Sequence, residues 1–160
     1  MRVNRGFTLI EVLVVIIIIS IITTASLMAF GDFGASRKAT VFAEQFASYV
    51  KLVRQRAILE MSTFGINVSN EGYETLRYEE GITWQARSKT SLFRWQNFPA
   101  NVLVVLKSEL KNNDKSPDIL IQSSGDMTPF TASFGTKAKP EQTILIGQHN
   151  GDILIKDKKS

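Results

Sequence analysis

An unbroken apolar segment near the N-terminus constrains this chain more than any other feature. From Phe7 to Phe30 the only charged residue is Glu11. A helix of this length extends about 36 Å at 1.5 Å per residue, which exceeds the roughly 30 Å hydrocarbon core of a bilayer. The segment therefore predicts a membrane-spanning helix at residues 7–30.

The residues that flank this segment predict its orientation. Arg2 and Arg5 precede it, and Asp32 follows it. By the positive-inside rule, the N-terminus stays in the cytoplasm and the rest of the chain lies outside. A secretory signal cleaved at a small-residue site near residues 23–25 is the competing interpretation. The apolar run continues to Phe30 and holds a carboxylate, and both features favour a retained helix.

Glu11 is the residue of this segment that calls for an explanation. A charge at the centre of a bilayer costs about 3 kcal/mol, and Glu11 lies about 6 Å along the helix from Phe7, near the interface. A carboxylate held there should have a cationic partner at the same depth on a neighbouring helix. Cleavage between Gly6 and Phe7 would create such a partner, because it would expose the α-amino group of Phe7.

Composition gives little support for catalysis or cofactor binding. The chain has no cysteine, one histidine (His149) and a formal net charge of +4. These counts exclude disulfides and thiolate metal sites, and the mild basic excess is typical of a solvated surface. No nucleophile or phosphate-binding motif is present. We therefore expect no catalytic residue, no metal and no cofactor, although the oxygens of Asn112, Asn113, Asp114 and Asp118 leave a calcium loop as a minor alternative.

After the apolar segment, hydrophobic residues recur at the spacing of one helix face. The members of this stripe are Phe42, Phe46, Tyr49, Val50, Val53, Ala57 and Ile58. The spacing predicts an amphipathic helix at about residues 36–62 that covers a sheet. It is either continuous with the first helix or separated from it at Gly31–Gly34. No proline lies between Phe7 and Phe30, so no proline kink is expected there.

Beyond residue 64 the hydrophobic period changes to that of β-strands. Strands are predicted at residues 64–68, 73–78, 82–86, 92–95, 102–106, 119–122, 130–134, 143–146 and 153–155. Asn150-Gly151 predicts a tight hairpin between the last two, and Lys107–Asp118 is expected to be an exposed loop. Strands that follow one helix indicate an α+β fold, with an antiparallel sheet packed on the helix.

The N-terminal motif carries a family resemblance. GFTLIEVLVVI, from Gly6 to Ile16, resembles the type III signal of type IV pilins and of the pseudopilins of type II secretion. The resemblance implies a leader at residues 1–6, cleavage after Gly6 by an inner-membrane prepilin peptidase, and N-methylation of Phe7. It also implies a salt bridge between Glu11 and the Phe7 amine of an adjacent subunit during assembly, with residues 31–160 forming a periplasmic head.

The head resembles one branch in particular, general secretion pathway protein H. The segments that carry this likeness are VRQRAIL, GITWQ, LFRW, SSGDMTPF and the terminal NGDILI. The resemblance implies a minor pseudopilin of the inner membrane and periplasmic pseudopilus, near the filament tip. Its implied partners are the major shaft subunit, the other minor tip subunits and the inner-membrane assembly platform. SSGDMTPF itself is expected to form a turn into an edge strand.

Two other functions compete with this interpretation. A minor pilin of a type IV pilus that captures DNA would use basic and aromatic residues of the head, namely Trp84, Arg87, Lys89, Phe93, Arg94, Trp95, Lys156, Lys158 and Lys159. Such a dispersed set is more typical of a solvated surface, which argues against nucleic-acid binding. A membrane-anchored enzyme is the third class, and no motif supports it.

Overall fold

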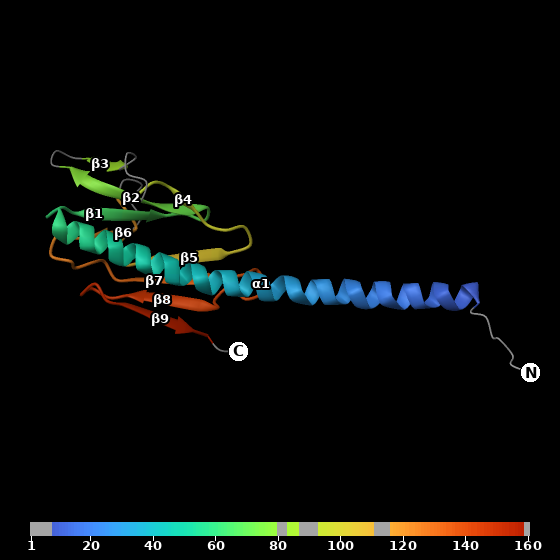
Figure 1. The fold of residues 1–160 in the computed structure, drawn as a ribbon. Coiled ribbons are helices and arrows are strands. Elements are labelled where there is room, and N and C mark those ends of the chain that lie inside the picture. The colour runs from blue at the N-terminus through green and yellow to red at the C-terminus, as the bar shows by residue number, and fades with distance from the viewer. Residues whose placement is uncertain (1–7, 80–82, 87–92, 111–115, 159–160) are drawn as a thin grey trace, which may run out of the picture. The chain divides into compact units, whose positions relative to one another are not determined.

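The computed structural model describes residues 8–79, 83–86, 93–110 and 116–158. Within them the chain forms one long helix followed by antiparallel strands, which confirms the predicted α+β class (Figure 1). The chain divides into two compact units, an N-terminal unit at Met1–Gly34 and a second at Ala35–Ser160, which we call the head.

A single helix, α1 (Leu9–Leu59), contributes to both units. It is helical through Gly31–Gly34, so the alternative of two separate helices is wrong. It ends at Leu59, before the expected residue 62. The final turn is closed by bonds from the Ser62 N–H to the Ala57 carbonyl (3.1 Å) and from the Met61 N–H to the Ile58 carbonyl (3.3 Å). Met61 has a φ of 48° and stands where such caps usually place glycine.

The strands form two antiparallel sheets, a division that the sequence analysis did not predict. Sheet A has the order β3-β2-β1-β6 with β4 paired to β2, and comprises β1 (Phe64–Val68), β2 (Gly72–Glu79), β3 (Thr83–Ala86), β4 (Gln96–Asn97) and β6 (Ile119–Ile121). Sheet B has the order β5-β7-β8-β9, and comprises β5 (Leu103–Ser108), β7 (Phe130–Gly135), β8 (Thr143–Gly147) and β9 (Ile153–Asp157).

Three of the local predictions are wrong. Phe93–Trp95 lies outside any strand, because Phe93 turns inward, is 3% exposed and stacks on Phe64 at 6.2 Å. The strand after SSGDMTPF is not at an edge, since β7 pairs with both β5 and β8. Pro129 immediately precedes that strand, so its missing N–H removes no ladder bond. The expected loop at Lys107–Asp118 begins later, because β5 continues through Ser108.

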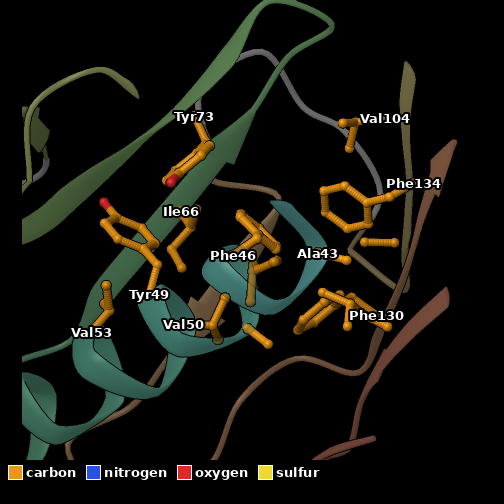
Figure 2. Close-up of a cluster of buried hydrophobic side chains, with 14 of the residues drawn as sticks. Ala43, Phe46, Tyr49, Val50, Val53, Ile66, Tyr73, Val104, Phe130 and Phe134 are labelled. Carbon is orange, nitrogen blue, oxygen red and sulfur yellow. The ribbon is translucent and has the colours of Figure 1, made fainter. Parts of the chain in front are cut away.

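The hydrophobic core joins α1 to both sheets (Figure 2). The ring centroid of Phe46 lies 5.0 Å from that of Tyr73 in β2 and 5.8 Å from that of Phe134 in β7. The predicted stripe is buried from Phe46 to Ala57, whereas Ile58 is 45% exposed. The predicted stripe omits Ala39, Ala43 and Ala47, although each is at most 3% exposed and their small side chains allow close helix packing.

Two turns of the head share both sequence pattern and geometry. They are Gln122–Asp126 and Gln148–Asp152, and each reads Gln, two variable residues, Gly and Asp. In each turn the first N–H donates to the last carbonyl (2.9 Å in both), and the glycine N–H donates to the first carbonyl (2.9 and 3.0 Å). Both glycines have φ near +90°. This is a three-residue hairpin loop with a left-handed glycine, and the second example confirms the predicted Asn150-Gly151 hairpin.

Arg54 of α1 joins these two turns. Its Nε donates to the Gly125 carbonyl at 2.8 Å, and its Nη2 donates to the Asn150 carbonyl at 3.0 Å. The Met127 N–H also donates to the His149 carbonyl at 2.9 Å. One guanidinium therefore ties the helix to the ends of both sheets.

Candidate functional site

The N-terminal part of α1 is apolar on every side. The segment Leu9–Ser26 has a mean hydropathy of 2.6, and none of it is buried. Leu9 and Ile10, for example, are 84% and 69% exposed. A helix with this surface is stable only where lipid or other apolar helices cover it. By length and composition it is able to cross a membrane.

Hydroxyl side chains in this segment are satisfied within the helix. Ser20, Thr23, Thr24 and Ser26 each donate to the carbonyl four residues earlier, at 2.7, 2.7, 2.8 and 2.9 Å. A hydroxyl bonded in this way presents no unpaired donor to an apolar surrounding. These residues were not predicted to have a role, although serine and threonine within a helical span are the signal for such bonds.

Glu11 lies in the first turn of α1 and is exposed. Its N–H and that of Val12 donate to the Thr8 carbonyl at 3.1 and 3.4 Å, which begins the helix. The amide dipoles at a helix N-terminus favour a carboxylate in this turn. Within the described part of the chain no cationic side chain forms an ion pair with Glu11. Gly6 and Phe7 lie outside the described residues.

The residues of the DNA-binding alternative do not form a stacking platform among the described residues. Phe93 is buried, and the ring of Trp84 packs on Tyr78 at 5.3 Å. The ammonium group of Lys158 lies 3.0 Å from the Glu141 carboxylate. Arg94, Trp95 and Lys156 are exposed, whereas Arg87, Lys89 and Lys159 lie outside the described residues.

The minor calcium alternative finds little support. Asn112, Asn113 and Asp114 lie outside the described residues, and Asp118 accepts a hydrogen bond from the Val68 N–H at 2.7 Å. Residues 8–79, 83–86, 93–110 and 116–158 contain no group of three or more His, Asp or Glu side chains that could hold a metal ion. His149, also in this part of the chain, is exposed at the tip of its turn.

Comparisons with known proteins give consistent results for the N-terminal segment and for most of the chain. Residues 1–27 match the family model of the prokaryotic N-terminal methylation motif. Type II secretion system protein H of Pseudomonas aeruginosa is 33% identical over 141 residues, which cover 81% of this chain and 82% of that protein. The Vibrio cholerae protein of the same name is 25% identical over an alignment of 188 positions, which covers 97% of this chain and 95% of that protein.

Solved structures share the fold of the head. The minor pseudopilin EpsH of Vibrio cholerae superimposes with a TM-score of 0.65 and 20% identity, over 77% of this chain and 99% of that one. The solution structure of Escherichia coli GspH gives a TM-score of 0.64 at 17% identity, over 77% and 90%.

An N-terminal methylation motif followed by an apolar helix and this α+β head defines a pilin-like subunit. The identity to the Pseudomonas aeruginosa protein extends over most of both chains. The chain belongs to the type II secretion system protein H family.

Proposed function

We propose that this chain is a minor pseudopilin that assembles into the periplasmic pseudopilus of a type II secretion system, near its tip, and thereby supports protein secretion across the outer membrane. The apolar part of α1 is the assembly element. The position near the tip rests on the resemblance to the H branch. The partners are the major shaft subunit and the other minor pseudopilins.

Assembly begins with processing at the N-terminus. A prepilin peptidase cleaves after Gly6, removes the leader at residues 1–6 and methylates the amine of Phe7, which keeps its positive charge. Residues 7–30 span the inner membrane with the N-terminus in the cytoplasm, and residues 31–160 form the periplasmic head. The inner-membrane assembly platform transfers the subunit from the bilayer into the filament.

The observation that carries this proposal is a carboxylate in the first turn of a helix whose other surface is apolar and exposed. Lipid tails are as apolar as leucine, so the aliphatic side chains gain little when they move from the bilayer to a filament core. Glu11 is different, because an unpaired charge is costly in either place. Pairing with the Phe7 amine of a neighbour lowers that cost, and it fixes the axial register between subunits more than it adds stability.

The proposal is tested by Glu11→Ala in a strain that lacks its own copy of this gene. Glu44→Ala is the matched control, since Glu44 is an exposed glutamate of the same helix within the head. We expect wild type and Glu44→Ala to restore secretion, and Glu11→Ala to fail although it is inserted and cleaved normally. If Glu11→Ala restores secretion and copurifies with the other pseudopilins as wild type does, Glu11 has no pairing role.

A further inference from the structure

One face of sheet B is covered by α1, and the opposite face is open. Phe134 and Leu145 on the covered face are fully buried. The alternating strand residues point the other way, and we call the surface that they form the outer face. Its aliphatic members are Leu103, Val105, Ile144, Ile146 and Leu154. Val105 is 50% exposed and Leu154 is 45% exposed, so apolar surface remains accessible across the sheet.

The strand register places two lysines at opposite corners of this outer face. One row across the sheet reads Val105, Ser133, Ile144 and Lys156. The next row reads Lys107, Thr131, Ile146 and Leu154. With strands about 4.8 Å apart and a rise of about 3.4 Å per residue, the Cα atoms of the two lysines are roughly 16 Å apart.

The charge of the outer face limits what can cover it. The outward positions of the four strands, all of them described, carry Lys107 and Lys156 but no carboxylate. The lysines of a second copy would therefore meet no carboxylate within the strands, since Glu109 and Asp152 lie just beyond the strand ends. No aromatic residue points outward from these strands, although tryptophan and tyrosine are the usual anchors at a lipid interface.

We propose that the outer face of sheet B docks a different pseudopilin, through an aliphatic surface of that subunit flanked by carboxylates. The aliphatic centre provides the apolar contact, and the two lysines select the acidic partner and its orientation. This docking rests on the proposed function, because a subunit assembled in a filament has other pseudopilins beside its head.

The test is photo-crosslinking in the full chain, expressed with the other pseudopilins of its secretion system. A benzophenone amino acid replaces Val105, and in a separate chain it replaces Val12 of the apolar helix. We expect residue 105 to form adducts with a different pseudopilin, identified by mass spectrometry. The double variant Lys107→Glu and Lys156→Glu should lower the adduct yield at least fivefold. Lys38→Glu with Lys51→Glu, which reverses two exposed lysines of α1, is the matched control and should leave the yield unchanged.

Four results would overturn the docking proposal. The first is adducts from residue 105 with a second copy of this chain alone, and the second is adducts with lipid alone. The third is no adduct from residue 105 while residue 12 crosslinks to other pseudopilins. The fourth is an equal loss of yield in both double variants, which would indicate a general charge effect. If neither position forms adducts and the wild-type chain does not restore secretion, the proposed function is itself refuted and the docking falls with it.

Discussion

Arg54 couples two turns of the head to α1, and its removal should destabilise the head by about 2 kcal/mol. A buried hydrogen bond to a charged group contributes roughly 1.5–3 kcal/mol. Gly125 is buried, so Arg54→Ala leaves its carbonyl unpaired at a cost of about 1.5 kcal/mol. Asn150 is exposed, so water replaces the second bond at a cost of about 0.5 kcal/mol.

Gly151→Ala should act through the same guanidinium. A Cβ at this position would lie 2.2 Å from the Arg54 Nε and 2.7 Å from the Gly125 carbonyl oxygen. The backbone φ of +87° adds about 1 kcal/mol of strain for alanine. Displacement of Arg54 adds its roughly 2 kcal/mol, so the single variant should lose about 3 kcal/mol in all.

The double variant separates these contributions. Once Arg54 is absent, Gly151→Ala retains its backbone strain and the close approach of its Cβ to the Gly125 carbonyl oxygen, so the pair should lose at least about 3 kcal/mol but less than the additive 5 kcal/mol. Chemical unfolding of the head, followed by circular dichroism, measures each value. In thermal unfolding, Arg54→Ala should lower Tm by roughly 6–10 °C.

Arg56→Ala is the control for the loss of an arginine from this helix. Arg56 is 48% exposed and lies 3.7 Å from Glu60, so its removal should cost about 0.5 kcal/mol or less. If the effects of Arg54→Ala and Gly151→Ala add to within about 0.5 kcal/mol, the two residues do not act through one guanidinium and the reasoning is refuted.

Two further substitutions test the core and the end of α1. Burial raises the pKa of Tyr49 to about 12, although its hydrogen bond with Thr75 opposes the shift. The unfolded chain loses this proton near pH 10 and the folded chain near pH 12, so stability should fall between these values by up to about 1.4 kcal/mol per pH unit. In urea unfolding, the free energy of unfolding of Tyr49→Phe should fall less steeply with rising pH in this range than that of wild type. Met61→Gly should raise the free energy of unfolding by about 0.5–1 kcal/mol, because glycine adopts the positive φ of 48° without strain.

Each of these predictions has its own control. Met61→Ala keeps the strained φ, so an equal gain in that variant would place the effect in the side chain rather than the backbone. If the stability of Tyr49→Phe falls as steeply at alkaline pH as that of wild type, other groups, such as Tyr73, account for the fall. The pKa of Tyr73 is also raised by burial.

Local sequence patterns were sufficient to predict features that depend on a single helix, strand or turn. β1 was predicted residue for residue at Phe64–Val68, and the stripe along α1 is buried from Phe46 to Ala57. The hairpin at Asn150-Gly151 followed from turn chemistry alone, because a glycine with positive φ is a local requirement.

Tertiary contacts decided the features that were missed. Phe93 has the alternation of a strand residue, but its ring stacks on Phe64 and the backbone leaves the strand geometry. The spacing of hydrophobic residues does not indicate which strands pair. Neither the division into two sheets nor the position of β7 between β5 and β8 could therefore be predicted.

The same distinction between local and distant contacts applies to the candidate site. The placement of Glu11 in an exposed apolar helix could be read from residues 7–30, since it depends on one helix. The role of Arg54 could not, because it bonds to turns far away in the chain. The Gln-x-x-Gly-Asp pattern of Gln122–Asp126, repeated at Gln148–Asp152, was the available signal of paired turns.

The most direct test of this account is the N-terminal residue of the mature chain, measured by mass spectrometry of the membrane fraction. We predict a chain that begins at N-methylated Phe7, because that amine is the counter-charge for Glu11. Gly6→Val should retain residues 1–6, whereas Gly34→Ala, where an added Cβ meets nothing within 4 Å, should mature normally. A mature chain that begins at any other residue, such as one after the small residues at 23–25, would contradict the account.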